Sequence, residues 1–213
     1  MKQRVILFDF DGVIADSFDV FYQALVRTLR EFGYSCVRNP SDFRGLFDRN
    51  LFQSLTALRV QVADQLELLA EVGRKVQGRV DDLRAFPGVT EVIRELCQDC
   101  PLYVITSNHG AMVRAFLARV DLLSCFRDVL GADADPSKVQ KIRAVRGLHP
   151  RQSLVYVGDT RGDMREARSA RTLRAAVLWG WHESERLRQE DPDFLLERPQ
   201  DLLRLRLSGA PVE

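Results

Sequence analysis

The chain contains five short apolar runs. From the second run onward, stretches with the periodicity of a helix lie between consecutive runs. The runs span residues 4–8, 102–106, 128–132, 154–158 and 175–179. An almost unbroken apolar run suits a strand covered on both faces, as in a parallel sheet. Helices are predicted over 88–98, 110–120, 136–146 and 162–170. Asp135 is expected to cap the third helix, with Pro136 in its first turn. This alternation predicts an α/β fold with a doubly wound parallel sheet and right-handed crossovers.

The interval from 16 to 86 interrupts the alternation, because it contains no convincing strand. Two apolar stripes at helical spacing occur there instead, formed by Phe18, Tyr22, Leu25, Leu29 and Phe32, and by Val62, Leu66, Leu69, Val72, Val76 and Val80. An interval of about seventy residues is long for a crossover connection. The stripes could pack directly on the sheet, but they pack more simply on each other. We therefore expect a core domain of residues 1–15 and 87–213, with an inserted all-helical domain over 16–86.

Composition narrows the class of protein. The formal net charge is +1, with both signs mixed along the chain, which argues against a nucleic-acid surface or a polybasic membrane anchor. No apolar run reaches the roughly 20 residues of a membrane span. Asp9 interrupts the first run, so no signal peptide is expected, and the cytoplasm is the default compartment.

Cys97 and Cys100 form a CxxC motif at the end of a predicted helix. Redox-active CxxC motifs favour the start of a helix, so these two cysteines are expected to be reduced structural thiols.

Polar residues stand after the predicted strands, where parallel sheets bind their ligands. They are Asp9 and Asp11 after the first run, Thr106, Ser107 and Asn108 after the second, Lys138 after the third, and Asp159 and Asp163 after the fourth. Four gathered carboxylates repel each other unless a cation joins them, and an all-oxygen ligand set suits Mg²⁺. One carboxylate could then attack a phosphate while its neighbour moves a proton. The paired aspartates therefore suit an aspartyl-phosphate mechanism, with Mg²⁺ and the lysine stabilising the transferred phosphoryl group.

In chain order, DFDGVIADS, ITSN, a lone lysine and GDTRGDMREA resemble the four motifs of the haloacid dehalogenase superfamily. The order and spacing match over nearly the whole chain. The closing stretch VLWGWHESERLRQEDPDFLLERPQDLL is similar to the end of phosphoglycolate-phosphatase-like members. The resemblance implies a Rossmann-like core with a helical cap over the site. It also implies a Mg²⁺-dependent phosphatase that hydrolyses a small phosphorylated metabolite, in a monomer or homodimer.

The resemblance implies roles for individual residues. Asp9 would be the nucleophile, and Asp11 would be the general acid and base. Thr106 would bind a phosphoryl oxygen, and the next two residues, Ser107 and Asn108, would contact the substrate.

The same resemblance implies a metal site and a lysine that holds the phosphate. Asp9, Asp11 (through its backbone carbonyl), Asp159 and Asp163 would hold Mg²⁺. Family members often carry the lysine in a Lys-Pro context, which DADPSKVQKI lacks. Lys138 is preferred because it lies in the first turn of its predicted helix. Lys141, one turn further on, could reach the same side but is interpreted as an exposed helix lysine.

The insert is expected to select the substrate. Its predicted loop FRGLFDRN offers Arg44 and Arg49 beside Gly45, and an arginine there could clamp a substrate carboxylate or second phosphate. A solvated surface arginine is an equal alternative. Two other functions stay open. A phosphosugar mutase of the β-phosphoglucomutase type shares all four motifs, and a non-catalytic binding protein could keep the same fold.

Overall fold

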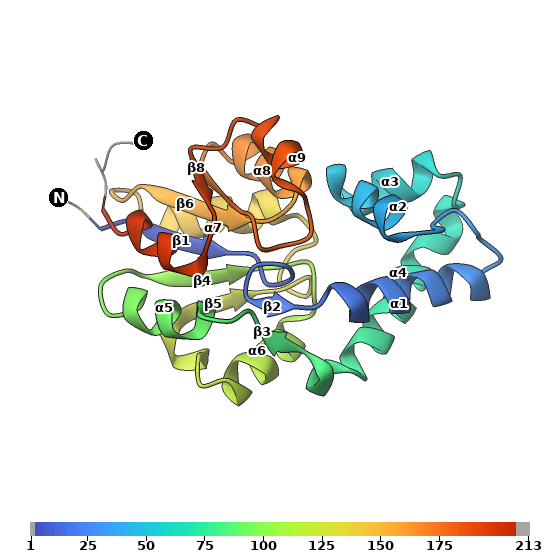
Figure 1. The fold of residues 1–213 in the computed structure, drawn as a ribbon, viewed down its shortest axis with the longest axis horizontal. Helices are drawn as coiled ribbons and strands as arrows, with labels where there is room; N and C mark the ends of the chain where they lie inside the picture. Colours follow the sequence, from blue (N-terminus) through green and yellow to red (C-terminus); the bar gives the residue numbers. More distant parts are fainter. Residues whose placement is uncertain (1–2, 208–213) are drawn as a thin grey trace. The chain divides into compact units, whose positions relative to one another are not determined.

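The computed structural model describes residues 3–207, and the chain divides into two compact units (Figure 1). One unit contains the chain up to Asp16 and from Arg84 onward, and it carries the main sheet. The other unit is the segment Ser17–Leu83, and it is helical. No helix among the described residues is both long and apolar enough to cross a membrane.

Six parallel strands form the main sheet, in the order β5-β4-β1-β6-β7-β8. Their bounds are β1 Val5–Phe8, β4 Leu102–Ile105, β5 Phe126–Leu130, β6 Leu154–Gly158, β7 Leu173–Val177 and β8 Phe194–Leu196. Every residue of β1, β4 and β6 is buried, as near-continuous apolar runs require. The predicted α/β class with a parallel sheet is confirmed, and the first strand lies at the centre of the sheet.

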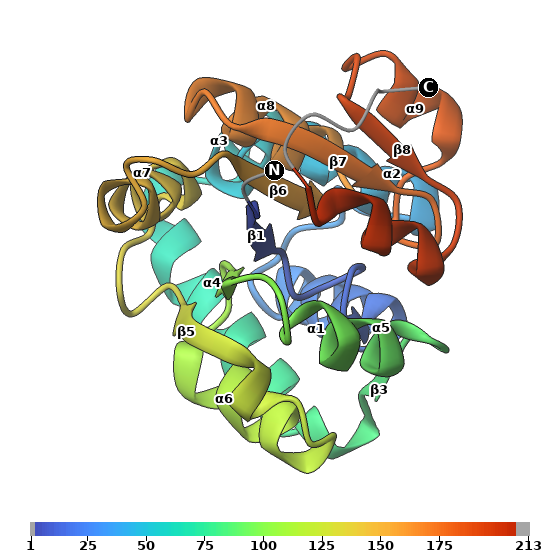
Figure 2. The same ribbon diagram turned by 90° about the vertical axis from the view of Figure 1, so that its left-hand side faces the viewer.

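Helices cover both faces of this sheet, as Figure 2 shows. Helices α5 (Val89–Leu96) and α6 (Gly110–Arg119) lie on one side, and α7 (Lys138–Leu148) and α8 (Arg161–Ser169) lie on the other. The short elements are η3 Leu123–Cys125, α9 Ser184–Arg188 and η4 Pro199–Leu205. One apolar cluster joins the sheet to α7 and α8; it comprises Val5, Leu7, Tyr103, Ile105, Ile142, Val145, Leu154, Tyr156, Ala167 and Ala170.

Several boundaries differ from the sequence predictions. The third and fifth strands begin two residues earlier than expected, at Phe126 and Leu173, because exposed or half-buried polar side chains are tolerated at their starts. The N-cap of α7 is Ser137, whose hydroxyl accepts a hydrogen bond from the Gln140 N–H at 3.4 Å. Asp135, the predicted cap, instead accepts from the Ser137 N–H at 2.7 Å.

Three strands were not predicted. The edge strand β8 has three residues between DPD and ERP, and this is too short to show periodicity. Strands β2 (Ala15–Asp16) and β3 (Arg84–Ala85) form an antiparallel ladder where the chain leaves and re-enters the sheet-bearing unit. Asp16 and residues 84–86 therefore belong to that unit, whereas the sequence assigned them to the insert.

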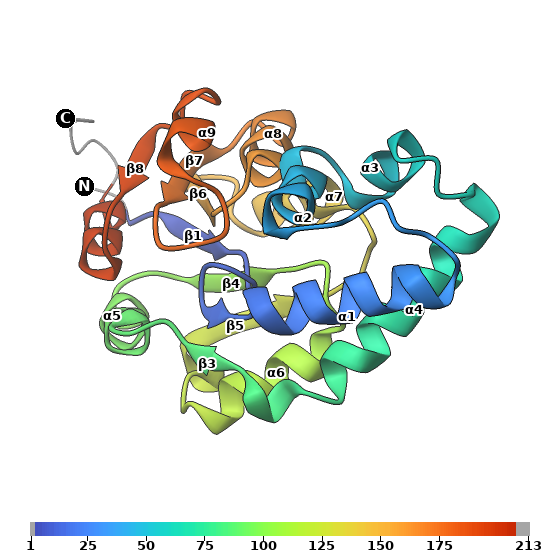
Figure 3. The same ribbon diagram turned by 45° about the vertical axis from the view of Figure 1, so that its right-hand side comes forward.

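The helical unit contains α1 (Phe18–Glu31), α2 (Pro40–Gly45), α3 (Leu51–Ala57) and α4 (Val62–Gln77), with the 3₁₀ turns η1 (Leu46–Asp48) and η2 (Val80–Asp82). Helices α1 and α4 pack side by side, as predicted (Figure 3). The predicted stripe of α4 is partly wrong, because Val62 and Leu66 are 71% and 72% exposed. Gln65 turns inward in their place, since its amide donates to the Val60 carbonyl at 3.1 Å.

Candidate active site

The nucleophile predicted from the sequence lies directly beyond the central strand. The Asp9 N–H donates to the Val157 carbonyl at 2.9 Å, so Asp9 continues the ladder between β1 and β6. The chain then turns sharply, since the Phe10 carbonyl accepts from the N–H groups of both Ile14 and Ala15. The Asp9 side chain is 6% exposed. A carboxylate is therefore held by backbone pairing at the carboxyl edge of the sheet, where parallel sheets bind ligands.

Three of the predicted carboxylates meet at this edge. Oxygen atoms of Asp9, Asp159 and Asp163 lie within 4.8 Å of one another, and all three residues are buried. Lys138 Nζ lies 2.8 Å from Asp9 Oδ2 and 2.7 Å from Asp163 Oδ1. One ammonium group thus contacts two of the three carboxylates, so the buried cluster would carry an excess negative charge if all three were ionised.

Asp163 is the carboxylate that its neighbours keep ionised. Its Oδ1 accepts from Lys138, and also from the Tyr156 hydroxyl at 3.2 Å. Its Oδ2 accepts from the Thr160 hydroxyl at 2.6 Å, in a capping box at the start of α8. Burial alone would raise the pKa of Asp163, but Lys138 and the Thr160 hydrogen bonds outweigh it and hold that pKa below its usual value.

The other two carboxylates are hard to ionise. Burial raises the pKa of Asp9 to about 8; Lys138 opposes this shift, while the charges of Asp163 and Asp11 add to it. Burial, followed by the charges of Asp163 and Asp9, raises the pKa of Asp159 well above its usual value. Without a further cation this cluster therefore tends to hold protons, because like charges in a buried site cannot all ionise.

Asp159 has an oxygen atom suited to a metal ion. Its Oδ2 accepts from the Trp181 backbone N–H at 2.7 Å, whereas its Oδ1 is buried and has no hydrogen-bond partner among residues 3–207. Gly12 (φ +71°) and Gly180 leave room for this carboxylate, since a Cβ atom at either position would overlap it. Three close carboxylates with an unsatisfied oxygen fit a hard divalent cation. Asp11 lies outside this group of side chains.

A second set of polar groups lies beyond β4. The Asn108 side-chain amide donates to Asp11 Oδ2 at 2.5 Å, and the Asn108 N–H donates to the Thr106 hydroxyl oxygen at 3.1 Å. Thr106 is fully buried, whereas Ser107 is exposed. The structure thus brings Asp11 and Asn108 together, and it places Thr106 beside them through the backbone of the turn.

The interpretation of Lys141 as an exposed lysine is wrong. Its side chain is buried, and Nζ donates to the carbonyls of Thr106 at 2.7 Å and Gly131 at 3.1 Å. Burial, together with the nearby charge of Lys138, lowers the pKa of Lys141 to about 8. Lys141 therefore joins the turn after β4 to the end of β5, while Lys138, one helical turn earlier, contacts the carboxylates.

Arg44 belongs to the helical unit. The segment predicted as a loop is instead helix α2 followed by the 3₁₀ turn η1, and Gly45 has a helical φ of −59°. The Arg44 guanidinium lies over the Phe18 ring, 4.6 Å from its centroid, and the residue is half-buried. Gly45 is thus not needed for a left-handed turn. Stacking on the Phe18 ring orients the Arg44 side chain.

Sequence reasoning missed several groups that position the carboxylates. The Trp181 N–H is a backbone donor, which no side-chain pattern shows. The Trp179 indole N–H donates to the Val13 carbonyl at 3.1 Å, so this segment also braces the turn after β1. Among these groups, only Thr160 could have been found from the sequence, because Thr-x-x-Asp before a helix is a pattern typical of an N-cap.

Mg²⁺ should stabilise the wild-type protein more strongly at pH 8 than at pH 6. A carboxyl group must lose its proton to bind a metal, and the pKa of Asp159 is raised, so metal binding competes with protonation. Thermal unfolding with and without Mg²⁺ at the two pH values measures the effect. The Asp159→Asn variant should lose most of the Mg²⁺-dependent shift. A shift that persists unchanged in Asp159→Asn would place the metal elsewhere.

Asn108→Ala should lower turnover by roughly 10- to 100-fold, the cost of one hydrogen bond to a charged group. The amide that orients Asp11 would be lost, while the backbone bond to Thr106 would stay. Steady-state kinetics on an aryl phosphate measure the change. His109→Ala is the control, because His109 is exposed, lies next to Asn108 and has no role assigned at the site. Equal effects of the two substitutions would show that the turn, rather than the amide, matters.

Comparison with known proteins identifies the family of this chain. Residues 6–177 match the family model described as haloacid dehalogenase-like hydrolase. The chain is 31% identical over 207 residues to a phosphoglycolate phosphatase of Synechococcus elongatus, covering 94% of this chain and 95% of the relative. It is 25% identical over 209 residues to the pyrophosphatase PpaX of Listeria monocytogenes, with 95% of both chains covered.

The fold is likewise shared with solved structures. A haloacid dehalogenase-like hydrolase from Streptococcus pneumoniae superposes with a TM-score of 0.79 at 24% identity, covering 94% of this chain and 96% of that one. The family match covers β1, the central strand, and extends through β7, and it includes every carboxylate of the cluster. On the strength of the family match and the relatives covered over nearly their whole length, this chain belongs to the haloacid dehalogenase-like hydrolases.

Proposed function

We propose that this protein is a Mg²⁺-dependent phosphatase that acts on a small phosphorylated metabolite through a phosphoryl group carried on Asp9. The observation that carries the proposal is the contact of Lys138 with both Asp9 and Asp163, next to a buried Asp159 oxygen that has no hydrogen-bond partner within residues 3–207. Such an arrangement would combine a nucleophile, a fixed cation and a metal site within one cluster. Family membership supports it, since a phosphatase is among the relatives.

The chain's own residues would divide the reaction into two steps. In the first, an Asp9 oxygen attacks phosphorus, the ester bond breaks, and Asp11 gives its proton to the departing oxygen. In the second, Asp11 takes a proton from water, which attacks the phosphorus and frees Asp9. Lys138 keeps Asp9 in place throughout. When bound by Asp9, Asp159 and Asp163, Mg²⁺ would supply positive charge that offsets the anionic phosphate.

Turnover of an aryl phosphate tests this activity directly. We expect phosphate release that requires Mg²⁺ and stops when the metal is chelated. A phosphosugar mutase would convert a sugar phosphate to its isomer without net release of phosphate. A non-catalytic binding protein would release none under any condition. The relatives named above are hydrolases, and this favours hydrolysis over the mutase.

For the substrate, we favour 2-phosphoglycolate over pyrophosphate. The relative named as a phosphoglycolate phosphatase is 31% identical, and the one named as a pyrophosphatase is 25% identical. Comparing kcat/KM for the two compounds, within a wider panel of phosphorylated metabolites, decides between them. A preference for pyrophosphate would overturn this choice but would leave the phosphoryl-transfer proposal standing.

Arg44 should contribute to substrate choice by binding an anionic group remote from the reacting phosphate. Arg44→Ala should raise KM for the best acidic substrate and leave aryl phosphate hydrolysis nearly unchanged. The expected loss is roughly 1.5–3 kcal/mol, as for one charge-assisted hydrogen bond. Steady-state kinetics on both substrates measure it.

Arg49→Ala is the matched comparison, because Arg49 is the other arginine that the sequence offered and is exposed just beyond the same helical segment, so we expect no change in KM. Equal losses on both substrates in Arg44→Ala would point to the stacking on Phe18 as a purely structural role. No loss on either substrate would make Arg44 a surface residue.

A further inference from the structure

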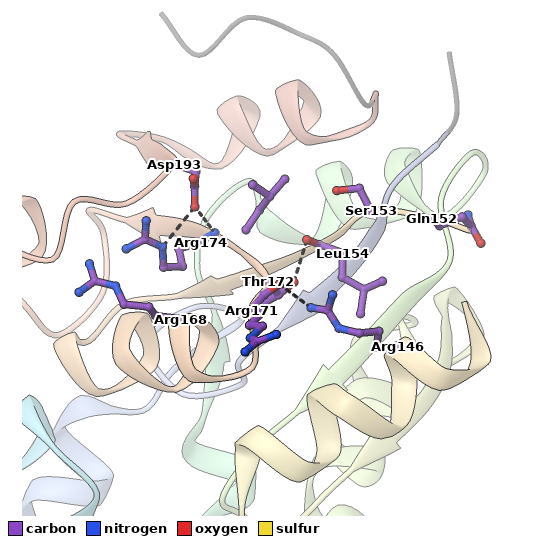
Figure 4. Close-up of a pocket in the computed structure, with 10 residues that line it drawn as sticks. Arg146, Gln152, Ser153, Leu154, Arg168, Arg171, Thr172, Arg174 and Asp193 are labelled. Atoms are coloured by element: carbon purple, nitrogen blue, oxygen red, sulfur yellow. Dashed lines mark hydrogen bonds and ion pairs between the residues drawn. The ribbon is translucent and has the colours of Figure 1, made fainter. Parts of the chain in front are cut away.

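A basic hollow lies at the amino ends of the parallel strands, near the starts of β6 and β7, whereas the candidate active site lies beyond their carboxyl ends (Figure 4). Its volume is about 410 Å³, within the usual range for small-molecule sites. Four arginines line it, Arg146, Arg168, Arg171 and Arg174, and the one acidic residue in its lining is Asp193. The lining therefore carries three more positive than negative charges, in a protein whose formal net charge is only +1.

The arginines retain donors that the protein does not use. Arg174 is largely occupied, because it donates to Asp193 at 3.2 Å and to the Glu190 carbonyl at 2.8 Å. Arg146 uses Nη2 for the carbonyls of Ala170 and Arg171, and its Nε is buried without a hydrogen-bond partner among the described residues. Because that Nε is shielded from solvent, Arg146 contributes mainly its charge to the hollow.

The other two arginines are less occupied still. Arg168 is exposed, and within the described part of the chain its side chain makes one hydrogen bond, from Nη2 to the Glu190 carbonyl. The Arg171 guanidinium makes no hydrogen bond or ion pair within residues 3–207. Unused guanidinium groups beside a concave surface are the donors that phosphate groups bind bidentately.

Helix capping accounts for some of these arginines but not for all. Cations are favourable near helix C-termini, and Arg146 and Arg168 lie in the last turns of α7 and α8. Arg171 lies beyond α8, at a left-handed position with φ +57°, where glycine is the usual residue. Arginine is strained at this position, but so is Arg59 at φ +64°, which does not line the hollow, so the strain by itself indicates no site. What distinguishes Arg171 is that its guanidinium lines the hollow and is not used by any described residue.

We propose that this hollow binds a small anion with two or more linked phosphate groups, held by Arg146, Arg168 and Arg171. Single carboxylates or phosphates would leave much of the excess positive charge unpaired. The candidate active site lies beyond the carboxyl ends of the parallel strands, whereas the hollow lies at their amino ends. The two sites therefore use different residues, and an anion could occupy the hollow while the active site is free.

Isothermal titration calorimetry with inorganic tripolyphosphate tests the proposal on the full chain. EDTA is present, so that the carboxylate cluster holds no divalent cation and repels the anion. We expect one binding site whose affinity falls as salt rises. The Arg168→Ala/Arg171→Ala variant should bind roughly tenfold or more weakly. The matched control is Arg127→Ala/Arg188→Ala, which removes two exposed arginines outside the hollow.

The Arg171→Gly variant keeps the test decisive if the double variant folds poorly. Glycine suits the φ of +57°, so this variant should be at least as stable as the wild type and yet bind tripolyphosphate more weakly. Three results would overturn the proposal: no binding by the wild type, equal losses in the hollow and control variants, or unchanged binding by Arg171→Gly.

Discussion

Asp9→Asn should fold normally and release no measurable phosphate from an aryl phosphate. An amide cannot form the proposed acyl-phosphate, so we expect kcat to fall on the order of 10⁴-fold or more, as for other enzyme nucleophiles. Asp11→Asn should leave a slow enzyme, because proton transfer contributes on the order of 10²–10⁴-fold. Steady-state kinetics of both variants, at matched Mg²⁺ concentration, measure the two losses.

The order of these losses is the informative result. In Asp9→Asn, Lys138 Nζ can still donate to the oxygen of the new side-chain amide in place of Asp9 Oδ2, so circular dichroism and thermal unfolding should resemble those of the wild type. Near-normal activity of Asp9→Asn would refute the proposed mechanism. A larger loss in Asp11→Asn than in Asp9→Asn would exchange the roles of the two aspartates.

Lys138→Met should cause the largest loss of stability of any substitution considered. Removing the one ammonium group beside Asp9 and Asp163 leaves buried carboxylates uncompensated, which costs about 3–5 kcal/mol. Asp163 would then lose the contact that keeps its pKa low, so the pKa should rise. The variant's free energy of unfolding should therefore fall further as pH increases from 5 to 8. Chemical denaturation at several pH values measures this.

Lys141→Met is the matched control on the same helix. It removes hydrogen bonds to two carbonyls rather than to carboxylates, so we expect a cost of about 1–3 kcal/mol with little change between pH 5 and 7. Mg²⁺ should partly restore the stability of Lys138→Met, because it supplies the missing positive charge, and should not restore Lys141→Met. The same pH dependence in both variants would contradict the assignment of Lys138 to the carboxylates.

The two lysines show what sequence reasoning can and cannot reach. The position of Lys138 in the first turn of α7 was readable, and it pointed correctly to the sheet edge. Lys141 lies on the same face, three residues later, and helical spacing gives no measure of depth. Its burial depends on carbonyls after β4 and β5, which only the folded arrangement brings within reach.

For the fold, too, local patterns were readable from the sequence, whereas features set by contacts between distant segments were not. Strands buried on both faces, such as β1 and β6, were predicted with nearly the correct bounds, because an apolar run has one simple explanation. The edge strand β8 and the β2–β3 ladder are set by pairing rather than by pattern, since their lengths are three and two residues. The hydrogen bond from the Trp181 N–H to Asp159 was missed for a related reason: every residue except proline carries a backbone N–H, so the sequence does not show which one will be used.

The central place of β1 has a consequence for the order of synthesis. The ribosome makes β1 first, yet its two neighbours, β4 and β6, begin only at Leu102 and Leu154. The whole helical unit is translated before either partner exists. The apolar segment Val5–Phe8 must therefore wait, with both edges unpaired, until β4 is made, and such edges invite aggregation. A nascent chain that stalls before residue 154 would carry Asp9 on a strand that still lacks one of its two neighbours.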